Sequence, residues 1–258
     1  MLGRQARLER EATAVEQTRR APIERAIDRH QVQVVFQPVV RLADGATVGY
    51  EALARLGERR DAPAPWFALA RELGLGTELE IMCVAAIVER GLPPGKALLF
   101  INVSPNTLLD PRLHSLCEPI ADRLVVELTE HVEVSDYTLL RPSIRAWSSR
   151  GGRLAVDDTC AGYSSLRHVL ELAPHFLKLD RSVVGGLDEH AARRALVRAL
   201  STFADDVQTT VIAEGVERGS EAEALRDAGV HLAQGFAFGR PEADWRPGGW
   251  PAAHARSA

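Results

Sequence analysis

Eight short apolar runs recur along the chain, and segments with helical patterning separate most of them. The runs are rich in Val, Ile, Leu and Phe, end on polar or acidic residues, and cover residues 34–40, 47–53, 98–104, 124–130, 153–158, 176–180, 209–217 and 233–239. This alternation predicts βα units and a largely parallel sheet. Eight such runs within 258 residues predict an α/β fold built on one closed (β/α)8 barrel of the TIM type.

The first two runs differ from the others in how they are joined. The short link between them contains Ala43-Asp44-Gly45, a sequence typical of a hairpin turn and too short for a helical crossover. A hairpin places its two strands antiparallel. We therefore expect a modified barrel in which one strand runs antiparallel.

The two ends of the chain have a different character from the repeating middle. Residues 1 to about 30 alternate Arg and Glu with Ala, Leu and Val, which predicts a solvated helix or, alternatively, a helical signalling or dimerisation segment. The last residues are rich in Pro, Gly and Ala and predict a loose tail. The expected organisation is a helical segment over 1–24, a barrel domain over 25–242 and a tail over 243–258.

Charge and cysteine content exclude several classes of protein. The 31 Lys and Arg residues against 35 Asp and Glu give a formal net charge of −4, which argues against binding of a DNA or RNA polymer. The cysteines Cys83, Cys117 and Cys160 are odd in number and lack metal-ligand spacing, which favours a reducing compartment and a cytoplasmic location. No apolar stretch approaches the roughly 20 residues that cross a bilayer, so we expect no membrane insertion.

Polar residues gather where the predicted strands end. In a parallel barrel the carboxyl ends of the strands meet at one mouth. So many carboxylates stay ionised together only if cations neutralise them, and oxygen ligands suit Mg²⁺ or Mn²⁺ better than zinc. The residues concerned are Glu51, Asn102, Glu127, Glu130, Asp157, Asp158, Lys178, Asp180, Glu214 and Glu217.

Two adjacent aspartates, Asp157 and Asp158, could bridge a pair of ions, an arrangement suited to in-line displacement at phosphorus. Taken singly, each of these acids is better explained as a structural residue, such as a helix cap. Their joint occurrence predicts a metal-dependent barrel hydrolase that acts on a phosphate ester. Spacing and composition reach no further than this.

The motifs around these residues resemble those of the EAL domain family. Glu51-Ala52-Leu53, within GYEALAR, resembles the signature that names the family. Further motifs follow in the family's order over roughly residues 25 to 241. They are Phe36-Gln37-Pro38, Ile101-Asn102-Val103-Ser104, Glu127-Leu128-Thr129-Glu130, Asp157-Asp158 with Ala161-Gly162-Tyr163-Ser164-Ser165-Leu166, Lys178-Leu179-Asp180, Ala213-Glu214-Gly215-Val216-Glu217 and Gln234-Gly235-Phe236.

The resemblance implies hydrolysis of the bacterial signalling dinucleotide cyclic di-GMP to linear pGpG with Mg²⁺ or Mn²⁺, on a barrel whose first strand is antiparallel. It assigns one ion to Glu51, Asn102, Glu127 and Asp157, and a second to Asp157, Asp158 and Glu214. Lys178 would hold or activate the attacking water, and Glu214 is the alternative general base; which group takes the proton stays open. The resemblance also implies a homodimer.

The substrate groove is expected from one physical argument and several motif matches. Arg55 lies two residues after Leu53 and four after Glu51, so strand alternation puts all three on the same face of the strand. There the Arg55 guanidinium can donate hydrogen bonds to two phosphate oxygens at once. By resemblance alone, Glu130 positions loop 6, the loop after Asp158. By the same resemblance, the groove is lined by Gln37, Asp180, Glu217, Gln234 and Pro241.

The chain departs from the family pattern in loop 6, where Thr159 and Cys160 replace a Phe and a Gly. A Gly at positive φ would be hard to replace by Cys, so the substitution bears on the loop's conformation. Both aspartates and Lys178 are retained, and we therefore expect catalysis to survive. The alternative is a non-catalytic cyclic di-GMP receptor that signals to a regulatory protein partner.

Overall fold

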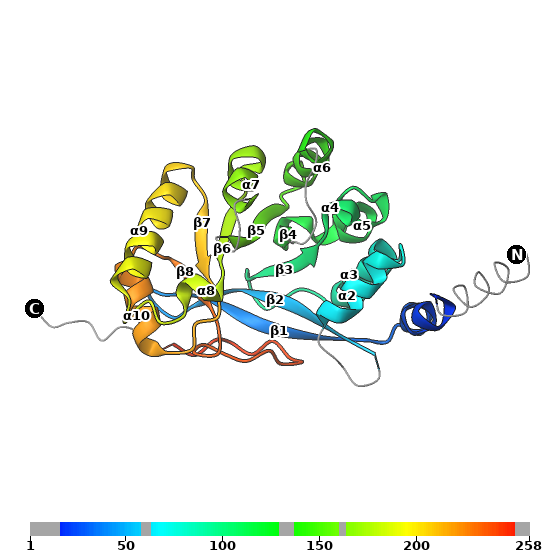
Figure 1. Ribbon diagram of the computed structural model, residues 1–258, viewed down its shortest axis with the longest axis horizontal. Coiled ribbons are helices and arrows are strands. Elements are labelled where there is room, and N and C mark those ends of the chain that lie inside the picture. Colours follow the sequence, from blue (N-terminus) through cyan, green and yellow to red (C-terminus); the bar gives the residue numbers. More distant parts are fainter. Residues whose placement is uncertain (1–15, 58–62, 129–136, 160–163, 251–258) are drawn as a thin grey trace, which may run out of the picture. The chain divides into compact units, whose positions relative to one another are not determined.

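The computed structural model describes residues 16–57, 63–128, 137–159 and 164–250, and within these its core is a closed barrel (Figure 1). The strands follow one another around the barrel in chain order. They are β1 (Val32–Arg41), β2 (Thr47–Leu56), β3 (Leu98–Val103), β4 (Leu124–Leu128), β5 (Arg153–Thr159), β6 (Phe176–Leu179), β7 (Thr210–Ala213) and β8 (Leu232–Gln234). The predicted modified TIM barrel is confirmed.

Strand β1 is the antiparallel member of the barrel. It pairs antiparallel with β8, with Val39 opposite Gln234, whereas the pairs from β2–β3 to β7–β8 are parallel. The turn after β1 closes with the Gly45 N–H donating to the Arg41 carbonyl and the Arg41 N–H donating to the Ala46 carbonyl. The hairpin expected from Ala43-Asp44-Gly45 thus reverses the direction of the first strand.

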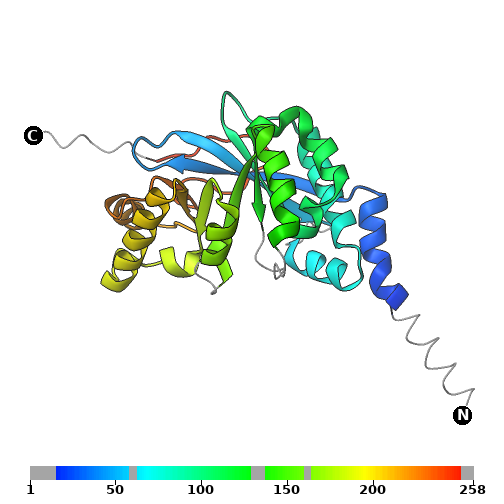
Figure 2. The same ribbon diagram turned by 90° about the horizontal axis from the view of Figure 1, so that it is seen from above.

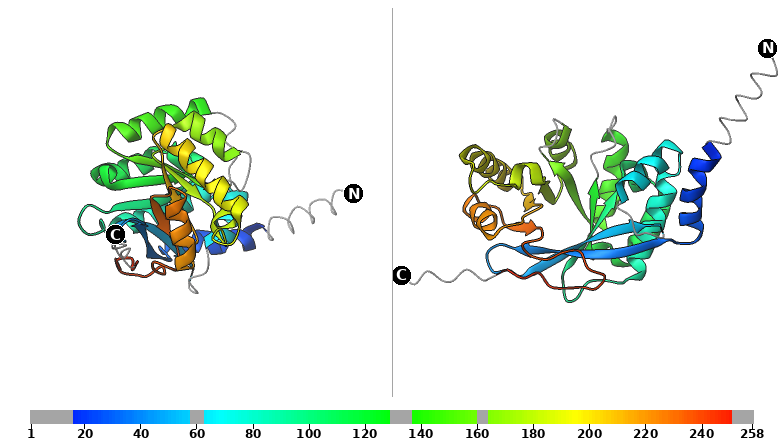
Figure 3. Two further views of the ribbon diagram at one scale, coloured as in Figure 1. Left: turned by 90° about the vertical axis from the view of Figure 1, so that its left-hand side faces the viewer. Right: turned by 60° about the horizontal axis from the view of Figure 1, so that its bottom comes forward.

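Helices occupy most of the connections between strands, and none in the described ranges is both long and apolar enough to cross a bilayer (Figure 2). After β3 come α4 (Pro105–Leu108), α5 (Pro111–Cys117) and the 3-10 helix η1 (Glu118–Arg123). The later connections hold α6 (Tyr137–Ser149), α7 (Ser164–Leu172), α8 (Arg181–Val184), α9 (Ala191–Asp206) and α10 (Gly219–Asp227). Helices α9 and α10 lie side by side (Figure 3).

The chain divides into two compact units, each with its own core. The first takes the described residues up to Val34 together with Ala54–Arg90, and the second takes Val35–Leu53 and the rest. The first unit contains a helix over residues 16–28, α2 (Pro63–Glu72) and α3 (Gly76–Glu89). In the core of this unit, Ile23 packs with Leu56, Ala70 and Leu79. Part of the predicted N-terminal helix is therefore packed through its apolar side.

Strand alternation divides the barrel residues of the second unit into an inner and an outer set. Inside the barrel, one apolar layer is formed by Val39, Phe100, Val125, Ala155, Phe176 and Ile212. The neighbouring residues, such as Val156, Leu177 and Val211, join the core that also contains Val197 of α9 and Leu225 of α10. Because both faces of these strands are buried, the strands appear in the sequence as continuous apolar runs.

One irregularity interrupts this regular pairing. Between β5 and β6, Val156 lies opposite Leu177, but Thr159 lies opposite Leu179, so β5 carries one extra residue at Asp157–Asp158. A bulge of this kind turns side chains away from the regular alternation. The pair expected to bridge two ions therefore occupies a bulge rather than a regular strand.

Residues 243–250, the described part of the expected tail, contact the barrel through two tryptophans. The Trp245 ring stacks on Phe36 with centroids 3.6 Å apart, and Trp250 meets Phe238 edge-on at 5.4 Å. The Gly248 N–H donates to Thr47 Oγ1 at 2.8 Å, which fixes this segment beside the β1–β2 hairpin (Figure 3).

The loops after β7 and β8 approach each other closely at Gly235. A Cβ there would lie 2.2 Å from the Val216 oxygen and 2.3 Å from its nitrogen, and the Gly235 φ of +154° is one that side chains rarely adopt. We expect Gly235→Ala to lower the free energy of unfolding by about 2 to 4 kcal/mol, from backbone strain and overpacking. Urea unfolding followed by tryptophan fluorescence measures this.

The matched control is Gly249→Ala, because a Cβ at Gly249 meets no atom within 4 Å. This variant should stay within about 0.5 kcal/mol of the unaltered chain. Equal stability of the two variants would contradict the close approach at Gly235.

The described cysteines, Cys83 and Cys117, are both free and buried. Burial raises the pKa of each thiol to about 12, so at about pH 8 only about one molecule in ten thousand carries either thiolate. We expect neither residue to react with iodoacetamide in the folded protein, while both react in guanidinium chloride. Peptide mapping by mass spectrometry distinguishes these sites, and rapid native labelling of either one would show that its environment is open.

Candidate functional site

Seven of the eight strands, and the residue directly after β7, each contribute one polar residue to a layer at one end of the barrel. Six of these lie two residues along the chain from a member of the inner apolar layer, as Asn102 does from Phe100 and Lys178 from Phe176. Period-two alternation therefore puts them on the inner face. The layer consists of Gln37, Glu51, Asn102, Glu127, Asp157, Lys178, Gln234 and Glu214, which directly follows β7.

Lys178 is the centre of this layer. Its Nζ lies 2.6 Å from Glu214 Oε1, 2.9 Å from Glu127 Oε1, 3.4 Å from Asp157 Oδ1 and 3.7 Å from Glu51 Oε1. The lysine is 1% exposed, and Glu127 is wholly buried. One ammonium group thus faces four carboxylates that come from separate strands.

The pKa values of the cluster follow from burial and this mutual charge. Burial lowers the Lys178 pKa, but the carboxylates of Asp157, Glu127, Glu214 and Glu51 outweigh it, and the pKa is raised well above its usual value. Burial raises the Glu127 pKa well above normal and that of Glu214 to about 8, in each case against the opposing charge of Lys178. The lysine is therefore an ammonium, and its single charge does not balance the acids around it.

Glu51 behaves differently because it accepts several hydrogen bonds. Burial alone would raise its pKa, but the charge of Lys178 and the amide donors of Gln234 and Asn102 lower it. Asn102 Nδ2 donates to Oε1 at 2.8 Å, and Gln234 Nε2 donates to Oε2 at 2.6 Å. Gln234 also donates to Gln37, so Glu51 is fixed from both sides as an ionised group.

The donor chemistry of the layer suits a hard divalent cation. The buried Glu127 is short of donors, because its Oε1 lies 2.9 Å from Lys178 Nζ but its Oε2 accepts no hydrogen bond from the described residues, a costly condition that a cation would relieve. Glu51, Asn102, Asp157 and Glu214 add further oxygen donors of the kind that Mg²⁺ and Mn²⁺ prefer. Across the described ranges no three His, Cys, Asp or Glu side chains converge at metal-ligand spacing, because the acids are arranged around the Lys178 ammonium.

A cavity of about 200 Å³ opens beside the polar layer. It brings together five predicted site residues, Gln37, Glu51, Glu214, Glu217 and Gln234. Its other lining residues are Leu53, Arg181, Gly215, Gly235 and Phe236. The cavity is therefore acidic on several sides, with one aromatic ring and one guanidinium group.

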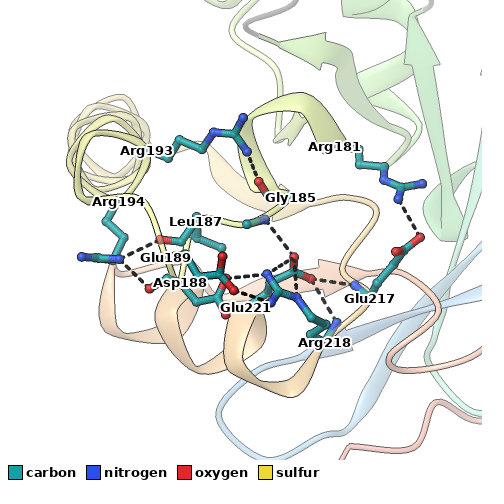
Figure 4. A network of polar contacts seen from close by, with 11 residues as sticks. Arg181, Gly185, Leu187, Asp188, Glu189, Arg193, Arg194, Glu217, Arg218 and Glu221 are labelled. Atoms are coloured by element: carbon teal, nitrogen blue, oxygen red, sulfur yellow. Dashed lines mark hydrogen bonds and ion pairs between the residues drawn. The ribbon is translucent and has the colours of Figure 1, made fainter.

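Arg181 is the lining residue that the sequence did not single out. It directly follows Asp180 at the carboxyl end of β6, a position that could have marked it. Its Nη2 lies 2.8 Å from Glu217 Oε1, and Figure 4 shows the two side chains pointing toward each other.

Other predicted residues lie elsewhere or outside the described parts. Asp180 caps α8, since its Oδ1 accepts the Ser182 N–H at 2.8 Å, and Pro241 does not line the cavity. Arg55 belongs to the first unit, where its Nη1 donates to the Ala54 carbonyl. Glu130, Cys160 and the side chain of Asp158 lie outside what the structure describes.

Removal of the Lys178 charge should expose the repulsion among the carboxylates. We expect Lys178→Met to lower the free energy of unfolding by about 3 to 5 kcal/mol in EDTA, since buried charges lose their partner. The chain's other lysine, Lys96, is exposed, and Lys96→Met should change stability by less than about 0.5 kcal/mol. Urea unfolding of both variants decides this, and similar small losses would show that Lys178 does not hold the cluster.

Known proteins resemble this chain in both sequence and fold. The model of the EAL domain family matches residues 20–241. An uncharacterized signaling protein of Caulobacter vibrioides is 30% identical over 230 residues, which cover 85% of this chain and 28% of that protein. The probable cyclic di-GMP phosphodiesterase PdeB of Escherichia coli is 28% identical over 231 residues, covering 83% of this chain and 43% of PdeB. The chain thus spans less than half the length of either relative.

Two solved structures give the same result. Klebsiella pneumoniae BlrP1 in complex with calcium and cyclic di-GMP has a TM-score of 0.74 at 29% identity, covering 82% of this chain and 56% of that one. The EAL domain of Xanthomonas citri FimX, solved with cyclic di-GMP, shares the fold with a TM-score of 0.79 at 20% identity, covering 93% and 100%. Because the family model matches residues 20–241, which is most of the chain, the chain belongs to the EAL domain family.

Proposed function

We propose that this chain hydrolyses cyclic di-GMP to linear pGpG with the help of Mg²⁺ or Mn²⁺. The observation that carries the proposal is the polar layer, in which each strand supplies a residue of the type and order that the family motifs predict. The names of two relatives agree with it, since PdeB and PdeI of Escherichia coli are both called probable cyclic di-GMP phosphodiesterases. BlrP1 has been solved with cyclic di-GMP and either calcium or manganese.

Glu51, Asn102, Glu127 and Asp157 would hold one ion, and Asp157, Asp158 and Glu214 a second. When bound, such ions lower the pKa of water and neutralise charge on the phosphoryl oxygens. Hydrolysis adds water across one P–O bond, so the product carries a terminal phosphate and a free hydroxyl group. Within the chain, the buried ammonium of Lys178 is a hydrogen-bond donor that orients the attacking water or a phosphate oxygen.

Phe236 offers the substrate an apolar surface. Its side chain lines the cavity while it is 47% exposed, and the guanidinium of Arg240 lies 4.1 Å from the ring centroid on one face. Aromatic rings at exposed sites of this kind stack on nucleobases. We assign Phe236 to contact with a guanine base of the substrate.

The homodimer and the regulatory partner are also proposals. Leu139 on α6 and Leu170 on α7 are the most exposed large apolar side chains in the described ranges, at 62% and 70%. Helices α6 and α7 pack together, and α7 begins just after loop 6. Two such side chains on neighbouring helices support an interface at this face.

Incubation of the purified protein with cyclic di-GMP and Mn²⁺ or Mg²⁺ tests the proposed function. We expect pGpG, resolved by chromatography, with no turnover in EDTA. Glu51→Ala removes an oxygen donor fixed by Asn102 and Gln234 and should reduce turnover at least about 100-fold. Glu223→Ala, an exposed change on α10, should leave turnover unaltered.

Each contrary result has a definite meaning. Binding of cyclic di-GMP without formation of pGpG would show that the chain is a non-catalytic receptor and not an enzyme. Absence of both binding and turnover would show that the substrate is wrong. Normal turnover by Glu51→Ala would show that the polar layer is not the active site.

A further inference from the structure

Resting on the proposed function, we infer that Arg181 binds the phosphodiester of the cyclic dinucleotide that is not being hydrolysed, and that Glu221 holds Arg181 in place through Glu217. A cyclic dinucleotide contains two phosphodiesters, and only one of them reacts at the polar layer. The second keeps its negative charge and must be accommodated within the same pocket.

The charge of the cavity makes a cation necessary for that second phosphate. Three carboxylates, Glu51, Glu214 and Glu217, line the cavity, and Arg181 is the cation among its described lining residues. Glu51 and Glu214 are assigned to the ions, whereas Glu217 is not, so a phosphate beside Glu217 would be repelled unless a positive group intervened. A guanidinium can also fork onto two oxygens of one phosphate, which fixes orientation as well as charge.

Arg181 has donors left for such a contact. Its ion pair in the described structure joins Nη2 to Glu217 Oε1, and the side chain is 63% exposed. A guanidinium carries five N–H donors, so a single carboxylate partner leaves several of them free for a ligand. Arg181 therefore combines a fixed position with an open binding face.

The stem of Arg181 is positioned by the bare backbone of Gly215. A Cβ on Gly215 would lie 2.7 Å from both the Cβ and the Cγ of Arg181, and Gly215 has a φ of +64°. The aliphatic stem thus lies against a glycine whose conformation other residues adopt with difficulty. This packing directs the guanidinium along the cavity wall toward Glu217.

Glu221 holds the segment that carries Glu217. Its carboxylate is buried on α10, where Oε2 accepts the N–H groups of Glu217 at 2.9 Å and Arg218 at 3.0 Å. Its Oε1 accepts the Gly186 N–H at 2.9 Å, which ties in the loop after α8. Glu221 is therefore a positioning residue that joins the segment bearing Glu217 to the loop after α8, the helix that begins with Arg181.

A second set of contacts strengthens this connection. Arg218 reaches Asp188 at 2.7 Å and Glu189 at 2.9 Å, so it ties the segment before α10 to the loop before α9 (Figure 4). Burial would raise the Glu221 pKa, but the N–H groups of Gly186, Glu217 and Arg218 lower it. The carboxylate stays ionised, and its bonds to these donors are charge-assisted.

The test compares two substrates, one with and one without a second phosphate. Cyclic di-GMP has it, whereas bis(p-nitrophenyl) phosphate is a single phosphodiester. Arg181→Met keeps the stem over Gly215 and removes the charge, so the KM for cyclic di-GMP should rise about 10- to 100-fold with kcat within about threefold. Turnover of bis(p-nitrophenyl) phosphate should stay within about twofold, and Arg181→Lys should recover part of the lost affinity.

Glu221→Gln tests the positioning role. Glutamine keeps the size of the side chain, but its amide nitrogen cannot accept the N–H groups that bind Glu221. We expect a smaller rise in the same KM, about 3- to 10-fold, and no further rise when the change is added to Arg181→Met. Glu223→Gln, on the exposed face of α10, is the matched control and should behave like the unaltered chain.

The outcomes separate this inference from the proposed function. Equal losses on both substrates, or an unchanged KM in Arg181→Met, would overturn the assignment of Arg181. If the unaltered chain binds but does not cleave cyclic di-GMP, calorimetric titration with Ca²⁺ replaces KM by Kd, and the same fold-changes are expected. If the unaltered chain does not bind cyclic di-GMP, the proposed function fails before any variant is compared, and the inference falls with it.

Discussion

A buried lysine surrounded by four carboxylates is the arrangement on which the rest of the barrel depends. Lys178 on β6 has no solvent to stabilise its charge, so its acidic partners must arrive from β2, β4, β5 and the end of β7. A slip of one residue in any of these strands would turn its carboxylate to the outer face. Barrel register and electrostatic balance therefore have to be satisfied together, and the apolar layer around Phe100 and Phe176 fixes the register from one side.

The same arrangement leaves the charges and hydrogen bonds of the site unbalanced. Glu127 Oε2 is buried without a hydrogen-bond donor from the described residues, and the Glu214 pKa is raised to about 8 by burial. A chain selected for stability alone would replace such groups with apolar residues of similar size. Their presence at one mouth of the barrel indicates that the arrangement serves a ligand, because strained and unsatisfied groups concentrate at functional sites.

Features that leave a local pattern in the sequence could be predicted from it, whereas features that depend on the pairing or packing of distant segments could not. The eight strands and the antiparallel hairpin follow from apolar runs and one turn, and the convergence of Glu51, Glu127 and Lys178 follows from alternation within those runs. The bulge at Asp157–Asp158 adds one residue without changing composition, so only the pairing of β5 with β6 reveals it. Arg181 was missed because an arginine after a helix-capping aspartate looks like any surface arginine until Gly215 and Glu217 are seen beside it.

The residues of the pocket are held in two different ways. The carboxylates around Lys178 lie on strands or directly after them, where the backbone ladder and the apolar layer fix their positions. Arg181, the first residue of α8, and Glu217 lie in the connections after β6 and β7, and one buried carboxylate, Glu221, ties these two connections together. Loop sequences vary more readily among related proteins than strand sequences do, so residues in these connections can change while the site residues on the strands are kept. Under the proposed function, the reacting phosphate and the rest of the substrate would be recognised by parts of the fold that can vary independently, and Glu221 would give the part outside the strands the rigidity that specificity requires.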